Sequence, residues 1–360
     1  IDGVQGSGGA HQFRGAPQPA AAGPLGPWSA LASLPAVADS LTGNVVWLVA
    51  GLGVLGLAAD RFVKGSVLLA SRLGVSKVVA GALIIGLGTS APELVVSVLA
   101  VWQGTEGTKL AVGNIVGSNM ANLGLVLALL ALVWGRFAIP RGTARQAALS
   151  LSGVSVFALM AAIGQPSEWI WGALLVLCLA VAMRGVVWLG KGFATQSPET
   201  PETVESTAFG AWTLTVLGLV GTVAGAHVVV ESSIEIGEEL GWTGGFVGFT
   251  LVAVGTSLPE LVTGAAAARR SQWGLIIGNL LGSNLFNSLG VGAAVFLVHL
   301  FKDLGPLDTF IDNWVLLGMV AASLVTLLIM GTKRVSRWEA AFMLALYGLV
   351  LWRMAAAAIV

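Results

Sequence analysis

The stretch Gly-Leu-Gly-Thr-Ser-Ala-Pro-Glu-Leu at residues 86–94 returns almost unchanged as Ala-Val-Gly-Thr-Ser-Leu-Pro-Glu-Leu at residues 253–261. Each copy is followed by a second shared block, Gly-Asn-Ile-Val-Gly-Ser-Asn-Met-Ala-Asn at 113–122 and Gly-Asn-Leu-Leu-Gly-Ser-Asn-Leu-Phe-Asn at 278–287. Both glutamates, Glu93 and Glu260, stand within apolar sequence, where a carboxylate is costly and is functional by default. The same acid in the same setting twice indicates a site that binds a cation.

The chain as a whole is strongly apolar. Of its 360 residues 56% are hydrophobic and only 10% are charged, and its mean hydropathy is +0.88. A soluble domain of this size could not bury so much apolar surface. The composition therefore predicts an all-α polytopic membrane protein whose main partner is the lipid bilayer.

Charge and rare residues exclude several classes of function. The formal net charge is zero, which argues against nucleic acid as a partner. With one cysteine and three histidines, neither an internal disulfide nor a zinc site of the usual kind is expected. No cofactor and no obligatory protein partner is implied.

Ten apolar segments are each long enough to span a bilayer. They lie at about 44–72, 76–103, 109–134, 146–164, 168–189, 209–238, 244–268, 273–301, 310–331 and 337–357. The Gly-, Ala- and Pro-rich residues 1–43 are expected to form a flexible leader. The polar segment 190–208 is expected to be a cytoplasmic linker between two sets of five spans, 44–189 and 209–360.

The basic residues predict the orientation of these spans. Of the 18 Lys and Arg residues, twelve follow odd-numbered spans; the others are Arg14, Lys109, Lys302 and Arg353 on the opposite side and Arg61 and Lys64 within the first span. By the positive-inside rule, the loops after odd-numbered spans are cytoplasmic and both termini lie outside. A prokaryotic inner membrane is the expected location, because targeting and regulatory segments are lacking.

The two copies are expected to cross the membrane in opposite directions. Five spans separate equivalent points of the copies, and five is an odd number. Inverted repeats of this kind place a binding site near the bilayer midplane, between broken helices. Such a site, open to each side in turn, is what a transporter needs.

Within each first block, glycine and proline predict an interrupted helix. Proline cannot donate a backbone hydrogen bond and suits the first turn of a new helix, so carbonyls of the preceding half become available to a cation. Thr89, Ser90 and Glu93 would share one face, as would Thr256, Ser257 and Glu260. Taken singly, each hydroxyl is better explained by a bond to its own helix backbone, and only their joint repetition favours a site.

The second block adds a serine and an asparagine four residues apart in each copy: Ser118 with Asn122, and Ser283 with Asn287. The Gly113/Gly117 and Gly278/Gly282 spacings are also typical of close helix packing, which needs no ligand. Since all candidate ligands are oxygens, the pattern favours Na⁺ or Ca²⁺ over transition metals.

These four motif matches, in this order within a ten-span chain, resemble the sodium/calcium exchanger family of the cation/calcium antiporter superfamily, of prokaryotic type. The resemblance covers about residues 44–358 and implies a secondary antiporter that exchanges Na⁺ for Ca²⁺ by alternating access. By motif position it implies the ion ligands Thr89, Ser90, Glu93, Ser118, Asn122, Thr256, Ser257, Glu260, Ser283 and Asn287. Asn287 stands where potassium-using members carry Asp, which argues against potassium co-transport.

Three alternatives remain open from the sequence. A proton-coupled cation antiporter of the same fold is the nearest, although the glutamate that this branch places shortly after Gly-Asn is missing here. A cation channel would also use a symmetrical pore. A hydrolase with Ser90 or Ser257 as nucleophile is the least favoured, because no His or Lys base lies near either serine in the sequence.

Overall fold

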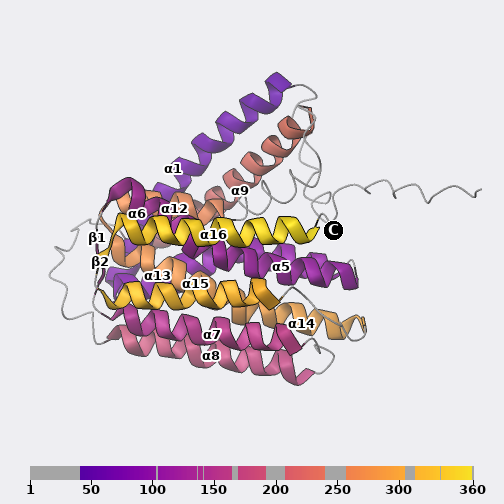
Figure 1. Cartoon of the computed structure of the whole chain (residues 1–360). Coiled ribbons are helices and arrows are strands. Elements are labelled where there is room, and N and C mark those ends of the chain that lie inside the picture. The colour runs from indigo at the N-terminus through magenta and orange to yellow at the C-terminus, as the bar shows by residue number, and fades with distance from the viewer. Residues whose placement is uncertain are drawn as a thin grey trace, which may run out of the picture. The chain divides into compact units, whose positions relative to one another are not determined.

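The computed structural model describes residues 41–102, 104–135, 137–140, 142–163, 169–191, 207–239, 257–304, 313–332 and 334–358. They belong to one compact unit, Val37–Val360, and are helical apart from two short strands (Figure 1). Eight helical segments in this part of the chain are long and apolar enough to cross a membrane. The predicted all-α membrane class is therefore confirmed.

The elements of the first half end at residue 191. They are α1 (Leu41–Leu73), α2 (Lys77–Ala80), η2 (Gly81–Gly86), α3 (Leu87–Thr89), α4 (Ala91–Trp102), α5 (Thr105–Ala121), η3 (Asn122–Leu127), α6 (Ala128–Trp134), β1 (Phe137–Ala138), α7 (Thr143–Ile163) and α8 (Trp169–Lys191). Those of the second half are α9 (Ala208–Glu239), α12 (Leu258–Arg269), α13 (Trp273–Phe286), η5 (Asn287–Val291), α14 (Gly292–Phe301), α15 (Asn313–Gly331), β2 (Arg334–Val335) and α16 (Arg337–Ala358).

Nine of the ten predicted spans coincide with helical segments to within four residues at either end. The seventh, 244–268, is described only from residue 257 onward, where α12 begins. Most of the predicted leader 1–43 and of the linker 190–208 lies outside the described residues. The tenth span corresponds to α16, which is not among the eight candidate segments.

Within the described residues, three of the spans contain a turn of π-helix. These turns are η2, which precedes the Gly-Thr-Ser motif, and η3 and η5, which begin at Asn122 and Asn287. A π-helical turn holds one residue more than an α-helical turn and is common at functional sites. The duplicated blocks therefore coincide with irregular helix rather than with plain α-helix.

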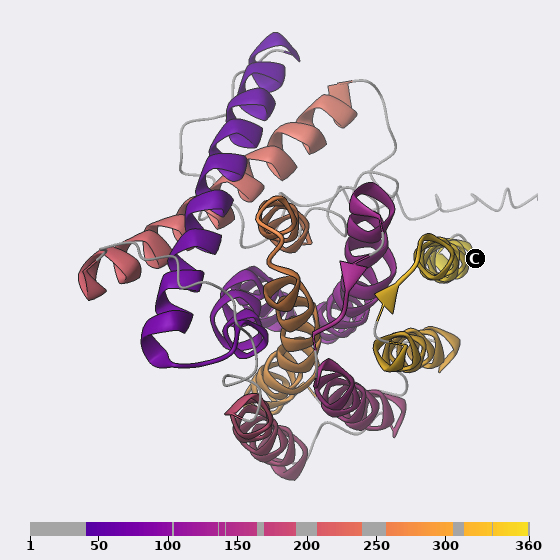
Figure 2. The ribbon, with the colours of Figure 1, turned by 90° about the vertical axis from the view of Figure 1, so that its left-hand side faces the viewer.

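Helix α13 lies at the centre of the helices that surround the duplicated blocks (Figure 2). Every residue from Gly274 to Leu285 is buried. Its glycines allow close approach to α2 and η2, because a Cβ on Gly278 would lie 2.1 Å from the Val78 carbonyl oxygen in α2 and one on Gly282 2.5 Å from the Ala82 Cα in η2. The small-residue spacing of the second copy thus packs two helices together, as this motif does in membranes.

Helices α1 and α9 pack mainly on each other and lie inclined to the other helices (Figures 1 and 2). Glycines make this contact close: a Cβ on Gly65 would lie 2.5 Å from the Thr215 nitrogen, and one on Gly218 2.5 Å from the Phe62 nitrogen. Neither position could take a larger residue without separating the two helices.

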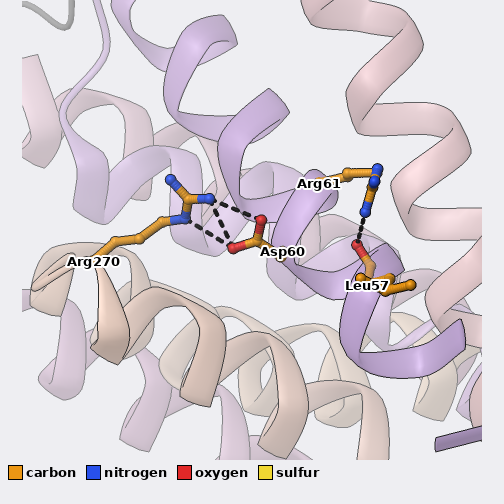
Figure 3. A network of polar contacts seen from close by, with 4 residues as sticks. All are labelled: Leu57, Asp60, Arg61 and Arg270. Carbon is orange, nitrogen blue, oxygen red and sulfur yellow. Dashed lines mark hydrogen bonds and ion pairs between the residues drawn. The ribbon is translucent and has the colours of Figure 1, made fainter. Parts of the chain in front are cut away.

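An ion pair connects α1 to the end of α12 (Figure 3). The Arg270 guanidinium donates to both oxygens of Asp60, at 2.7 and 2.8 Å from Nη2 and 3.1 Å from Nε. The neighbouring Arg61 turns away and donates to the Leu57 carbonyl oxygen at 2.9 Å. Since Asp60 is half exposed, the ion pair contributes at most about 1 kcal/mol to stability. Its main effect is to keep the Asp60 side of α1 against the end of α12.

The two strands join distant loops. β1 and β2 pair antiparallel, with Phe137 opposite Val335 and Ala138 opposite Arg334. The loops that follow the third and the ninth predicted span are therefore on the same side of the helices.

Candidate functional site

The helix is interrupted at Ser90, as the sequence predicts, and in the second motif, which is described only from Ser257, a helix begins at Leu258. Ser90 and Ser257 have nearly the same backbone angles, φ −86° and ψ 2° for the first and φ −92° and ψ 3° for the second. Helices α4 and α12 begin at the next residue, each with its proline in the first turn. This places Glu93 and Glu260 in the first turn of a helix, where the helix dipole favours a negative charge.

Nine of the ten predicted ligand residues are described, and all nine are buried. Both glutamates are 0% exposed, and the other seven side chains are at most 2% exposed: Thr89, Ser90, Ser118, Asn122, Ser257, Ser283 and Asn287. Thr256 lies outside the described residues. The predicted hydroxyl and amide residues thus share the interior with the two acids.

One hydrogen-bonded chain joins the two copies at Glu93. The Ser118 hydroxyl donates to Glu93 Oε1 at 3.0 Å, and Asn287 Nδ2 donates to the same hydroxyl oxygen at 3.2 Å. Ser118 therefore orients both a carboxylate of its own copy and an amide of the other.

The second acid is held differently. The Glu260 carboxylate lies close enough to that of Glu93 for their charges to repel each other, and the side chains of Thr89 and Ser283 lie beside it. Within the described part of the chain, neither Glu260 oxygen accepts a hydrogen bond. The Ser283 hydroxyl donates instead to the Gly86 carbonyl oxygen at 3.2 Å.

Unpaired buried oxygens gather on the predicted ligands. Among the described residues, these oxygens have no hydrogen-bond partner: Ser90 Oγ, Glu93 Oε2, Asn122 Oδ1, Ser257 Oγ, Glu260 Oε1 and Oε2, and Asn287 Oδ1. Buried polar atoms are otherwise almost always paired. Carboxylate, hydroxyl and amide oxygens are the ligands that Na⁺ and Ca²⁺ accept, so a bound cation would satisfy these atoms.

The donor set limits the kind of metal. In the ranges described here, no group of three or more His, Cys, Asp and Glu side chains comes together. Two carboxylates and several neutral oxygens suit a hard cation that tolerates irregular coordination, as Ca²⁺ does, better than a transition metal.

Sequence reasoning missed three asparagines of the second block. Asn279 Oδ1 accepts hydrogen bonds from Thr89 at 3.3 Å and from Ser283 at 3.5 Å. Asn284 and Asn119 are 0% exposed and hydrogen-bonded near the predicted ligands. Their repetition within Gly-Asn-X-X-Gly-Ser-Asn was the available signal, but the sequence does not show which asparagine contacts which residue.

Comparison with known proteins agrees with this geometry. The family model for sodium/calcium exchanger proteins matches the chain twice, over residues 43–188 and 210–355. The chain therefore belongs to the sodium/calcium exchanger family, and it is an integral membrane protein. The resemblance inferred from the motifs is confirmed.

Individual relatives match this chain over nearly the whole of their own length. The sodium/calcium exchanger MaX1 of Methanosarcina acetivorans is 30% identical over 348 residues, which cover 85% of this chain and 97% of MaX1. An uncharacterized membrane protein of Methanocaldococcus jannaschii is 32% identical over 304 residues, 84% of this chain and 95% of that protein. A structure of the sodium-calcium exchanger NCX_Mj, soaked with Na⁺ and Ca²⁺, superposes with a TM-score of 0.72 at 30% identity, covering 86% of this chain and 97% of the other.

Proposed function

We propose that this chain is a secondary antiporter that exchanges Na⁺ for Ca²⁺ across a membrane by alternating access to one site between Glu93 and Glu260. The observation that carries the proposal is the pair of fully buried, neighbouring carboxylates, with oxygens that no described residue pairs. Two negative charges balance one Ca²⁺ or two Na⁺. Because both ions need the same oxygens, binding of one excludes the other, and this exclusion is the basis of exchange.

The proposed ligand set contains both copies of both motifs. It comprises Thr89, Ser90, Glu93, Ser118 and Asn122 from the first copy and Thr256, Ser257, Glu260, Ser283 and Asn287 from the second. The burial of the nine described members and the unpaired oxygens on six of them support this set. The names of MaX1 and NCX_Mj, both sodium/calcium exchangers, support the choice of ions.

Ten spans, arranged as two inverted repeats of five, are the proposed architecture. Because β1 and β2 are hydrogen-bonded, they lie on one side of the membrane, so an even number of crossings separates them. Five candidate spans lie between them, at 143–163, 169–190, 208–232, 273–301 and 313–331. A sixth crossing is required, and the segment that ends in α12 supplies it, as the predicted span 244–268 implies.

The tenth crossing is α16, whose 22 residues extend over about 33 Å, enough for the hydrocarbon core. Residues 44–189 and 209–360 then form the two repeats, on either side of a cytoplasmic linker at 190–208. The two separate matches of the family model, 43–188 and 210–355, support this division. The proposal also places the loops after odd-numbered spans on the cytoplasmic side and both termini outside. The membrane is proposed to be a prokaryotic plasma membrane.

Uptake of ⁴⁵Ca²⁺ into proteoliposomes tests the function. Vesicles containing the protein are loaded with Na⁺ and diluted into Na⁺-free medium, with pH and membrane potential clamped. Uptake that requires internal Na⁺ and accumulates Ca²⁺ against its gradient is expected. Uptake that follows a pH gradient without Na⁺ would establish proton coupling instead, and purely passive flux would indicate a channel.

Replacement of Ser118 by alanine is expected to weaken Ca²⁺ binding about tenfold to a hundredfold. The change removes the donor to Glu93 Oε1 and the acceptor of Asn287 Nδ2, and a hydrogen bond to a charged group contributes about 1.5–3 kcal/mol. The half-saturating Ca²⁺ concentration of uptake measures the effect. Ser323→Ala is the matched control, because in the described part of the chain this buried serine bonds only the Met319 carbonyl oxygen of its own helix. Equal values for both variants would contradict the role given to Ser118.

A further inference from the structure

An asparagine ligand works only when its amide is turned the right way. The side chain has a donor end, Nδ2, and an acceptor end, Oδ1, and only Oδ1 can bind a cation. Asn122 and Asn287 occupy equivalent places in the two copies and begin the π-helical turns η3 and η5. In each, Oδ1 has no partner among the described residues, so something must hold Nδ2.

For Asn122 that partner is Asn284. Asn122 Nδ2 donates to Asn284 Oδ1 at 3.0 Å, and Asn284 Nδ2 donates to the Asn119 carbonyl oxygen at 3.1 Å. The Asn119 carbonyl oxygen can only accept, so it fixes which end of the Asn284 amide is the acceptor. That acceptor in turn fixes the donor end of Asn122 and leaves Asn122 Oδ1 free. Three fully buried residues thus set one orientation in succession.

The two copies differ at this point. Asn119 is the counterpart of Asn284, but its Nδ2 donates to Ser288 Oγ at 2.8 Å and contacts Met319 Sδ at 3.4 Å. Asn287 is held instead by Ser118, through its Nδ2. The side chain of Asn119 therefore bonds no proposed ligand in the described structure, whereas that of Asn284 bonds one.

We infer that Asn284 is a positioning residue of the ion site, which holds the Asn122 amide so that Oδ1 faces the ions. The inference rests on the proposed function and extends it. Asn284 lies on α13 and Asn122 at the start of η3, so the contact joins the two halves of the chain. Asn122 is held in its ligand orientation only while α5 and α13 keep the relative position that allows this hydrogen bond.

Four variants test the inference: Asn284→Leu, Asn122→Ala, the double variant Asn284→Leu/Asn122→Ala and the control Ser323→Ala. Leucine keeps the branching of asparagine but can neither donate nor accept. Asn284→Leu is expected to raise the half-saturating Ca²⁺ concentration about tenfold with the maximal rate within about twofold. Ser323→Ala, at a buried serine of α15 that donates to the Met319 carbonyl oxygen of its own helix, is expected to stay within about twofold of wild type in both quantities.

The double variant separates positioning from general packing. If Asn284 acts through Asn122, adding Asn284→Leu to Asn122→Ala is expected to change the half-saturating concentration less than about twofold. A full tenfold effect in that background, or an equal effect of Ser323→Ala, would overturn the inference. Should Asn284→Leu not fold, Asn284→Ala takes its place in the same cycle.

Wild type and Glu260→Gln are measured alongside. Absence of Na⁺-dependent uptake in wild type would refute the proposed function itself. A different result would refute only the role of Asn284. In that case wild type exchanges normally, Glu260→Gln does not, and Asn284→Leu has the half-saturating Ca²⁺ concentration of wild type, so the proposed function stands.

Discussion

Substitution of Glu260 or Glu93 by glutamine is expected to reduce Na⁺-dependent Ca²⁺ uptake more than a hundredfold while the protein still folds. Each change removes one of two buried negative charges that face the proposed ion, and loss of one partner of a buried charge pair costs about 3–5 kcal/mol. Glu260 offers two oxygens without a partner among the described residues. In Glu93, Oε1 already accepts from Ser118, so a glutamine there would turn its NH₂ group towards the ion.

Glu339→Gln is the matched control for both variants. Glu339 also lies in the first turn of a helix, α16, where its Oε2 accepts from the Ser336 backbone nitrogen at 2.7 Å and the Ser336 hydroxyl accepts from the Glu339 nitrogen. Glutamine preserves such a capping box, so uptake near the wild-type level is expected. The variants are compared in the proteoliposome assay after size-exclusion chromatography confirms folding. Uptake by either site variant within tenfold of wild type would remove that carboxylate from the site.

Gly278→Ala is expected to lower the thermal unfolding temperature by several degrees and to reduce exchange at least tenfold. The new Cβ would lie 2.1 Å from the Val78 carbonyl oxygen and 3.1 Å from the Ala82 nitrogen. Both atoms belong to backbone, so the helices α2 and α13 must move apart, and overpacking of this kind costs about 1–3 kcal/mol. The same interface carries the hydrogen bond from Ser283 to Gly86, so the site would be distorted too.

Tryptophan fluorescence during heating in detergent measures the stability, since the chain has 13 tryptophans. Gly348→Ala serves for comparison, because this exposed glycine of α16 has no atom within 4 Å of the added Cβ. It is expected to unfold and to transport as wild type does. Normal stability of Gly278→Ala would mean that α2 and α13 are not packed as closely as described.

Much of the fold could be predicted from the sequence, because apolar length and the basic loop residues are local signals. The spans predicted at 44–72 and 273–301 correspond to α1 and to α13 through α14. The interruption at Ser90 and the helix start after Ser257 could also be predicted, since glycine and proline act on their own backbone. Burial of the acids followed from their place within apolar sequence.

Contacts between distant segments could not be predicted in the same way. The ion pair of Asp60 with Arg270 joins residues 210 positions apart, and no periodicity of either segment indicates it. The hydrogen bond from Asn122 to Asn284 depends on which faces of α5 and α13 meet, which is decided by packing rather than by residue type. Repeated sequence also suggests equal roles for Asn119 and Asn284, whereas their side chains have different partners.

The π-helical turns make the site tolerant of a change in the number of residues before it. The π-helical turn η2, Gly81–Gly86, leads into α3 with Thr89, and the interruption at Ser90 separates both from Glu93 in α4. Because a π-helical turn holds one residue more than an α-helical turn, a chain one residue shorter at this point would close an ordinary α-helical turn and leave Thr89 and Glu93 facing as they do here. Sequence comparison of such chains can therefore accept a single gap within 81–86 where every motif residue is retained.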